Sequence, residues 1–363
     1  MRRTYRAVAL LALVALVAAG CGKKPASTSS GGGGTAAKYP NFLACEVTDT
    51  GGVDDRSFNA TSWKGVQNAQ KDFGVQIKLL ESSTANDYVP NLRAFAQQKC
   101  GLIVTVGFLL GDATRDSAKA NASEKYAIVD FAYDPKDVPN NNVLGLTFST
   151  DQAAFLAGYV ASAMSKTHKL GTFGGINIPT VTIFMNGFWA GMKYYNKKNN
   201  ANTQLLGWDP AKPKGGLFTG DFTNQDNGKR LAETLMSQGA DIILPVAGNV
   251  GLGAAAAVKA AGGDKHMIWV DTDGCVSAAQ YCSLFITSVQ KHMDVAVEDA
   301  VKTTASGAYK GGTYVGTLAN NGVGIAPFHD FDSQVPANVK ADLDTIKQGI
   351  ISGTISVKTS DYS

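Results

Sequence analysis

Short apolar runs alternate with segments of helical periodicity from Tyr39 onward, and this alternation restricts the fold more than any other feature. Strand-like runs separated by helical segments are typical of a parallel sheet covered by helices. The expected strands are 42–47, 75–80, 102–106, 126–131, 143–148, 170–173, 204–208, 242–246, 267–270 and 284–289, with a long helix over 151–167. The sequence therefore predicts an α/β fold.

Two of these segments, one in each half of the chain, have similar sequence patterns. The runs 102–107 and 242–248 are both apolar strands that end in a glycine, and a helix of small residues follows each. A chain of 363 residues is long enough for two domains of ordinary size. We therefore expect two α/β lobes of related build that meet near residues 148–151.

The first 21 residues have the layout of an export signal. Residues 1–6 are basic, and residues 7–20 form an apolar run that is too short to span a bilayer. Two small residues before Cys21 resemble a lipobox, so Cys21 is expected to carry lipid and to become the amino terminus. A cleaved signal with a free cysteine is the alternative. Residues 22–38, rich in Gly and Ser, predict a flexible tether.

Four cysteines remain beyond Cys21. An even number in an exported chain indicates disulfides, and four cysteines allow three pairings. The local solution joins Cys45 to Cys100 and Cys275 to Cys282. A zinc site is disfavoured, because the sequence has no Cys-x2-Cys pair and its four histidines are scattered.

Ligands of open parallel sheets bind outside the carboxyl ends of the strands, so the residues that follow each expected strand are site candidates. The first strand leads to Asp54-Asp55-Arg56-Ser57-Phe58-Asn59, where Ser57 is expected to cap a helix that ends at Phe73. The other candidates are Gly107, Phe108, Asp130, Gly174, Gly175, Phe184, Phe188, Gly248, Asn249, Asp271, Asp273 and Lys291. Carboxylates, rings and a lysine are groups that hold a small polar ligand. The alternative for the first loop is an ordinary turn, with Phe58 in the core.

These candidates contain no coherent catalytic set, and no enzyme is expected. The sequence has neither a Gly-x-Ser-x-Gly elbow nor a histidine at the end of an expected strand. Gly251-Leu-Gly253-Ala-Ala-Ala256 does match a dinucleotide-binding fingerprint, with Asp271 twenty positions beyond its first glycine. Such glycines also serve close helix packing, so an exported dinucleotide-binding enzyme is the lesser alternative. A net charge of only +3 gives no indication of nucleic-acid binding.

Several segments together resemble the basic membrane protein family, whose members are lipoprotein substrate-binding components of ABC importers. The segments are 55–59 (Asp-Arg-Ser-Phe-Asn), 102–108, 154–159, 187–191, 246–248, 271–273 and 287–291, in the family's order. The best understood members are purine nucleoside receptors. The resemblance implies a type I periplasmic-binding-protein fold, with two Rossmann-like lobes and a ligand cleft between them. The first lobe would hold 39–149 and 286–312, and the second would hold 150–285 and 313–363.

The resemblance also implies where the protein works and with which partners. It implies a monomer, lipid-anchored outside the cytoplasm on the bacterial cell membrane, that serves an ABC permease and needs no cofactor. Arg56 stands where Lys is common in the family, and an extra cysteine pair is a second departure. Neither falls on an expected ligand contact.

For the ligand, the resemblance implies a purine nucleoside whose base lies between the rings of Phe58 and Phe188. Buried carboxylates are natural acceptors for ribose hydroxyls, and an amide can read the edge of a purine. The expected ligand-binding set is Asp55, Ser57, Phe58, Asn59, Phe108, Asp130, Phe188, Gly248, Asp271 and Lys291. Two alternatives stay open. Phe188 could instead be a core residue of its helix, and the protein could be a receptor for a sugar or an amino acid on the same fold.

Overall fold

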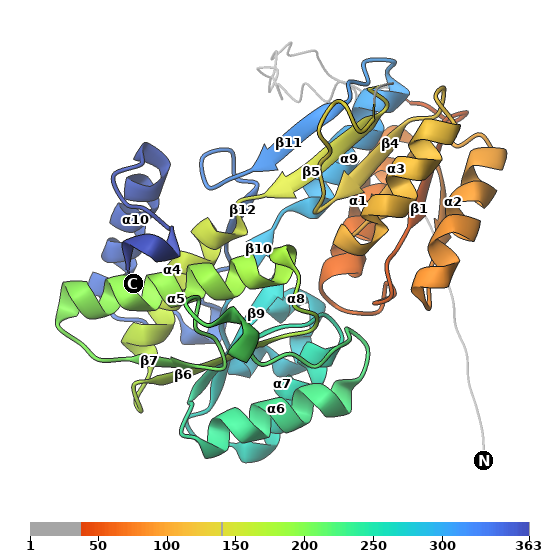
Figure 1. Ribbon diagram of the computed structural model, residues 1–363. Coiled ribbons are helices and arrows are strands. Elements are labelled where there is room, and N and C mark those ends of the chain that lie inside the picture. Colours follow the sequence, from red (N-terminus) through yellow and green to blue (C-terminus); the bar gives the residue numbers. More distant parts are fainter. Residues whose placement is uncertain (1–37, 139–140, 363) are drawn as a thin grey trace, which may run out of the picture. The chain divides into compact units, whose positions relative to one another are not determined.

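Two six-stranded sheets form the body of the protein (Figure 1). The computed structural model describes residues 38–138 and 141–362. The predictions of a signal segment, a lipidated Cys21 and a tether therefore fall outside the described residues, except for Lys38. Among the described residues, no helix is both long and apolar enough to cross a membrane.

The first sheet is wholly parallel and has the strand order β11-β5-β4-β3-β1-β2. The second has the order β12-β10-β9-β8-β6-β7, in which only the edge strand β12 runs antiparallel. The strands of the first sheet are β1 (Leu43–Val47), β2 (Gln76–Leu80), β3 (Leu102–Val106), β4 (Tyr126–Val129), β5 (Val143–Phe148) and β11 (Gly312–Gly316). Those of the second are β6 (Lys169–Gly174), β7 (Gln204–Leu206), β8 (Ile242–Val246), β9 (His266–Asp271), β10 (Phe285–Lys291) and β12 (Val323–Ile325).

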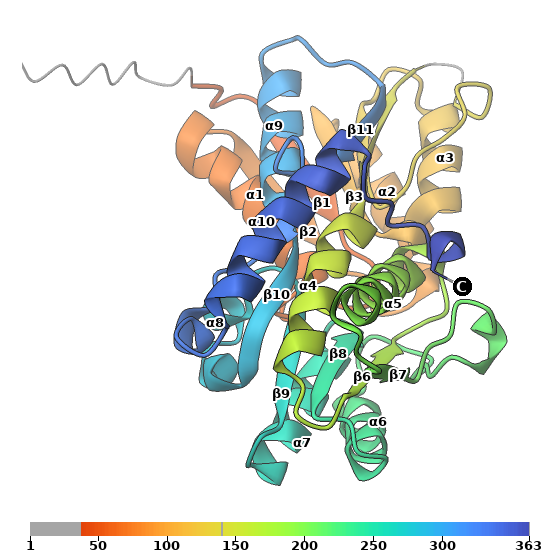
Figure 2. The same ribbon diagram turned by 90° about the vertical axis from the view of Figure 1, so that its left-hand side faces the viewer.

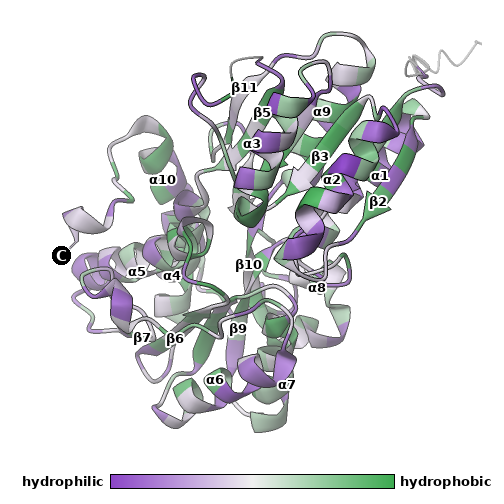
Figure 3. Ribbon diagram, turned by 45° about the vertical axis from the view of Figure 1, so that its right-hand side comes forward, coloured by the Kyte–Doolittle hydropathy of each residue, from purple (hydrophilic) through white to green (hydrophobic). Residues whose placement is uncertain are grey.

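Helices cover both faces of each sheet, so the central strands are buried and apolar (Figure 3). Helices α1 and α9 pack on one face of the first sheet, and α2 and α3 on the other. The second sheet lies between the pair α4 and α5, which pack against each other (Figure 2), and the pair α6 and α7. The helices are α1 (Phe58–Phe73), α2 (Tyr88–Gln97), α3 (Gly111–Ala120), α4 (Thr150–Met164), α5 (Pro179–Asn199), α6 (Gln225–Ser237), α7 (Val250–Ala261), α8 (Gly274–Ser277), α9 (Met293–Ala305) and α10 (Ala337–Ser352).

The two lobes repeat one topology. In strand order, β7-β6-β8-β9-β10-β12 corresponds position by position to β2-β1-β3-β4-β5-β11. The similar segments 102–107 and 242–248 are part of this repeat, because they contain β3 and β8, the third strands of their lobes. The α/β class and the two related lobes are therefore confirmed.

The boundaries between the lobes differ from those expected. Residues 286–291 had been placed in the first lobe, but they belong to β10, which pairs with β9 in the second sheet. Residues 313–316 had been placed in the second lobe, but they belong to β11, which extends the first sheet beside β5. The first crossing, at 148–150, lies where it was expected. Backbone bonds tie the crossings together: Ser149 N–H donates to Gly316 O, and His292 N–H donates to Gly322 O.

Two disulfides are present, in the local pairing expected from the sequence. Cys45–Cys100 ties β1 to the loop two residues before β3, and Cys275–Cys282 closes the turn that contains α8. Each bridge lies within one lobe, so neither restricts movement of the lobes against each other.

Candidate functional site

The carboxyl ends of strands from both sheets meet around one pocket, with an empty volume of about 510 Å³ that is partly open to solvent. The first lobe contributes Asp49, Gly51, Asp55, Phe58, Asn59, Gly107, Phe108 and Asp130, and the second contributes Ile178, Thr180, Val181, Phe184, Phe222, Val246, Ala247, Gly248, Asp271 and Lys291. The pocket thus lies where the strand-end rule places a site in each lobe.

Asp55 organises the loop between β1 and α1. Its buried carboxylate accepts hydrogen bonds from the N–H groups of Ser57, Asn59 and Ala60 at 2.8–3.0 Å. These are the N–H groups at the start of α1, which otherwise lack a partner. The sequence placed the N-cap at Ser57, and Ser57 does occupy that position, but its side chain makes no cap bond.

Ser57 instead connects the two lobes. Its Oγ lies 2.6 Å from Oδ2 of Asp271, at the end of β9, and 3.4 Å from the carbonyl oxygen of Val270. Ser57 is fully buried and does not line the pocket. Its position fixes one oxygen of Asp271 and leaves the other for Lys291.

Lys291, the last residue of β10, is a buried cation held by two carboxylates. Its Nζ lies 2.6 Å from Oδ2 of Asp130 and 3.5 Å from Oδ1 of Asp271. The same nitrogen lies 4.5 Å from the centre of the Phe58 ring and 5.4 Å from that of Phe184. Burial alone would lower the pKa of Lys291, but the charges of Asp130 and Asp271 outweigh it and hold that pKa above its ordinary value. A charged ammonium therefore stands at the centre of the pocket wall.

Asp130 and Asp271 occupy equivalent places in the repeat. Asp130 directly follows β4 and Asp271 ends β9, the fourth strands of their lobes. Both have positive φ, 63° and 68°, a conformation that Asp tolerates better than most residues. The turn that each makes aims its carboxylate at Lys291. The strand expected over 126–131 ends at Val129, directly before this turn.

A second polar cluster lies in the first lobe. Asn59 Nδ2 donates to Oδ1 of Asp49 at 2.8 Å, and Asn59 Oδ1 is buried with no partner among the described residues. Burial raises the pKa of Asp49 to about 6 and that of Asp55 to about 7. Gly107, at φ 109°, leaves room for Asp49, because a Cβ there would lie 2.6 Å from Oδ2 of Asp49.

Aromatic rings from both lobes line the pocket, but Phe188 is not among them. Phe58 and Phe108 come from the first lobe, and Phe184 and Phe222 come from the second. Phe188 is fully buried where α5 packs closely against α4, so its predicted ligand contact was wrong. It lies four residues beyond Phe184, about 6 Å further along α5, which begins near the pocket and leads away from it.

Eight of the ten expected ligand-binding residues thus line one pocket, and Ser57 and Phe188 do not. Sequence reasoning missed Asp49, which follows β1 by two residues and could have been found by the strand-end rule itself. It also missed Phe222, an aromatic residue in the polar loop before α6. That loop gave no strand or helix pattern, so nothing local placed it at the pocket.

The dinucleotide-type glycines have a packing role. A Cβ on Gly253 would lie 1.8 Å from the carbonyl oxygen of Gln225 in α6, and one on Gly251 would lie 3.2 Å from the Trp269 ring. The glycines therefore allow α7 to pack closely against its neighbours, which agrees with a packing role and not with a dinucleotide site. Asp271, the proposed ribose-binding acid of that motif, is committed to the pocket between the lobes.

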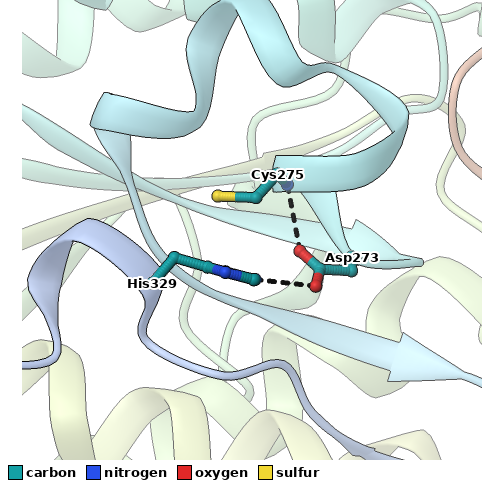
Figure 4. A group of neighbouring side chains, drawn as sticks. All are labelled: Asp273, Cys275 and His329. Atoms are coloured by element: carbon teal, nitrogen blue, oxygen red, sulfur yellow. Dashed lines mark hydrogen bonds and ion pairs between the residues drawn. The ribbon is translucent and has the colours of Figure 1, made fainter.

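Asp273, Cys275 and His329 form the one group of metal-type side chains within the described residues (Figure 4). Cys275 Sγ is bonded to Cys282 and offers no thiolate. Asp273 is occupied as well: Oδ1 accepts from the N–H of Cys275 at 3.0 Å, and Oδ2 lies 2.7 Å from Nε2 of His329. The group therefore fastens the turn after β9 rather than presenting free ligands.

Comparison with solved structures agrees with this architecture. The fold matches a solute-binding protein of an ABC transporter system from Aeropyrum pernix with a TM-score of 0.77, at 24% identity over 87% of this chain and 92% of that one. A solute-binding protein from Conexibacter woesei matches with a TM-score of 0.64, at 20% identity over 86% of this chain and 98% of that one. Both support the type I periplasmic-binding-protein fold.

Sequence relatives cover nearly the whole chain. A CD4+ T-cell-stimulating antigen of Listeria innocua is 31% identical over 98% of both chains. The ABC transporter nucleoside-binding protein BmpA of Lactococcus lactis is 30% identical over 98% of this chain and 99% of its own. Basic membrane protein A of Borreliella afzelii is 32% identical over 85% and 89%. Residues 42–361 match the family model described as ABC transporter substrate-binding protein PnrA-like. This chain therefore belongs to the Bmp family of PnrA-like ABC transporter substrate-binding proteins.

Proposed function

We propose that this protein binds a purine nucleoside in the pocket between its lobes and delivers it to an ABC permease. One observation carries the proposal: aromatic rings from both lobes line a pocket that also holds four carboxylates and a single ammonium group. A nucleoside has a flat apolar base and a ribose with several hydroxyl donors, so it matches both features. The lipid anchor, the extracytoplasmic location and the monomeric state belong to the same proposal.

The base stacks between Phe58 of the first lobe and Phe222 of the second, which takes the place first given to Phe188. Base–aromatic stacking contributes roughly 1–3 kcal/mol per base. Phe58 is half-buried and begins α1, whose start is held by Asp55. Its ring is thus presented by a fixed element, which reduces the entropy lost on binding.

Asp49 and Asn59 read the edge of the base. The unpaired Oδ1 of Asn59 and the carboxylate of Asp49 are acceptors, so they favour a base with N–H donors. Hypoxanthine and guanine carry such a donor at N1, whereas adenine carries an acceptor there. A buried acceptor left without a donor costs about 1–3 kcal/mol, enough to discriminate between bases.

Asp130 and Asp271 accept the ribose hydroxyls, with Lys291 between them. Each carboxylate has lone pairs beyond those used by Lys291 and Ser57. Hydrogen bonds from hydroxyls to ionised carboxylates are roughly twice as strong as those between neutral groups. Because the two carboxylates come from different lobes, a ligand held by both favours the closed arrangement, the form that a permease would recognise.

The charge of the pocket favours nucleosides over nucleotides. One ammonium group faces four aspartates, and Lys291 is already within 3.5 Å of two of them. A phosphate would enter a surplus of negative charge and find no free cation among the residues that line the pocket. Unfavourable charges built against a competing ligand are one way in which a site gains specificity.

The relatives support this assignment. The Lactococcus lactis protein, 30% identical over nearly the full length of both chains, is named a nucleoside-binding protein. The family consists of substrate-binding proteins, so we expect the ligand to be released unchanged.

Thermal unfolding of the purified protein tests the proposal with a panel of guanosine, inosine, adenosine, guanosine monophosphate, sugars and amino acids. A nucleoside at a hundred times its dissociation constant should raise the free energy of unfolding by about 2.7 kcal/mol. Guanosine monophosphate should give little shift, and guanosine should be recovered intact. A shift with a sugar or an amino acid and none with nucleosides would replace this proposal by a receptor for that solute.

A further inference from the structure

The lobes also touch outside the pocket, at Arg56. Its Nη1 donates to the carbonyl oxygen of Ser277 at 3.2 Å, and its own carbonyl oxygen accepts from Nε1 of Trp269 at 3.3 Å. Arg56 has a positive φ of 56°, so the loop doubles back here and presents both groups to the second lobe. None of these three residues lines the pocket.

The acceptor for Arg56 is held firmly in place. Ser277 ends α8, a helix of only four residues, which is too short to be stable alone. The Cys275–Cys282 bridge closes this turn covalently. Asp273 caps the N–H of Cys275 and is itself held by His329 from η5 (His329–Phe331), near the carboxyl end of the chain (Figure 4).

We propose that Arg56 and this disulfide-closed turn, residues 273–282, form a latch that sets the ligand affinity without touching the ligand. The latch bond joins residues of different lobes, so it exists only while the lobes are close. A contact made in one state and not in the other shifts the population toward that state. Apparent affinity scales with the fraction of molecules in the binding-competent form, so losing the latch weakens binding.

The latch also acts on the pocket through the chain itself. Arg56 lies between Asp55, which caps α1, and Ser57, which bonds to Asp271. Holding Arg56 against Trp269 and Ser277 therefore holds its two neighbours where the pocket needs them. Arg56 and the turn are positioning elements, because neither contributes an atom to the pocket wall.

Titration calorimetry with guanosine measures the latch in four forms: the wild type, Arg56→Ala, the double variant Cys275→Ser/Cys282→Ser, and their combination. This measurement rests on the proposed function. A hydrogen bond of this kind contributes enough that we expect each change to raise the dissociation constant about three- to ten-fold. Both act on one bond, so the combination should be no worse than the weaker-binding parent. Arg93→Ala, an exposed arginine of α2, should leave the constant unchanged.

A second readout needs no ligand. The indole N–H of Trp269 bonds to the backbone of Arg56, which survives the Arg56→Ala change. Its hydrogen exchange, followed by NMR in the protein with ¹⁵N-labelled tryptophan, should become faster in Arg56→Ala and in the double cysteine variant. If guanosine does not bind to the wild type, the proposed function is wrong. The exchange rate of the Trp269 indole N–H then tests the latch without a ligand. Unchanged Trp269 exchange in both variants, or strictly additive losses of affinity, would overturn the latch.

Discussion

Phe58 and Phe188 show how far single residues could be assigned from the sequence. Both were expected to stack on the base, and both stand on helices that begin near the carboxyl ends of strands. Phe58 is the first residue of α1 and lines the pocket, whereas Phe188 lies ten residues into the 21-residue α5 and is buried against α4. Whether a helix residue reaches a site depends on its depth along the helix and on which neighbouring helix it packs against, and the α4–α5 contact joins segments far apart in the sequence.

The two rings therefore predict opposite consequences of truncation. Phe58→Ala should weaken guanosine binding by roughly 1–3 kcal/mol, about ten-fold or more, while the melting temperature without ligand changes little. Phe188→Ala should lower the free energy of unfolding by about 3–5 kcal/mol, because it leaves a cavity in the α4–α5 packing. Calorimetry and thermal unfolding of the matched pair decide between these roles. A Phe58 variant that unfolds but binds normally when folded would make that residue a core anchor.

Asp49 predicts a pH dependence that differs between purines. Its pKa is raised to about 6, so it changes from protonated to ionised between pH 5 and pH 7. Ionised Asp49 accepts from N1–H of inosine, whereas only protonated Asp49 can donate to N1 of adenosine. The ratio of the adenosine to the inosine dissociation constant should therefore rise with pH, by up to about ten-fold per unit, both below and above pH 6.

Asp49→Asn is the control for this dependence, because an amide can both donate and accept and does not titrate. Titrations of both nucleosides from pH 5 to pH 8 should show a nearly flat ratio in this variant. A wild-type ratio that stays constant over the same range would remove Asp49 from the edge of the base.

At the scale of elements, the sequence predicted the position of the loop from β1 to α1 correctly. It did not predict the hydrogen bonds that the side chains of this loop make. The pattern after β1 predicted a helix start, and a helix begins at Phe58. Ser57 was the natural cap by residue type, but its hydroxyl bonds to Asp271, 214 positions away, and Asp55 takes over the capping. Local preference is overridden here by a contact between the lobes that no window of sequence contains.

Strand β1 carries a buried acid that predicts a stability effect. Glu46 bonds to Oγ of Ser62 at 2.9 Å, while its Oε1 has no partner among the described residues. Burial raises the pKa of Glu46 to about 8 from an ordinary 4.5. Between these values the unfolded chain has lost the proton and the folded protein keeps it, so stability falls as pH rises, by at most about 1.4 kcal/mol per unit.

Glu46→Gln keeps the shape and removes this titration. Its free energy of unfolding relative to the wild type should therefore increase steadily from pH 5 to pH 8 in chemical denaturation. Comparing the two proteins cancels the contributions of Asp49 and Asp55, whose pKa values are also raised. A difference independent of pH would show that Glu46 is already ionised in the folded protein.

For the whole molecule, the sequence predicted two related lobes but misplaced two strands between them. β10 was given to the first lobe and β11 to the second, the reverse of the pairing observed. Which sheet a strand joins after a crossing is decided by its tertiary partners. β11 is a largely exposed edge strand of sequence Gly-Thr-Tyr-Val-Gly, so it carries no apolar run by which to assign it.

The repeated topology of the two lobes places equivalent residues on both sides of the site. Equivalent strand ends supply Asp130 and Asp271, and the crossing after β10 places Lys291 between them. A ligand that bonds to both carboxylates contacts both lobes and so favours the closed arrangement. The latch at Arg56 favours the same arrangement. Affinity is therefore a property of the paired lobes.

A crystal structure of the protein with guanosine tests the central claim most directly. We predict the base between the rings of Phe58 and Phe222, with N1–H toward Asp49 or Asn59. The ribose hydroxyls should lie within about 3.2 Å of oxygens of Asp130 or Asp271. Guanosine bound outside this pocket, or bound in it with the base away from both rings, would contradict the account.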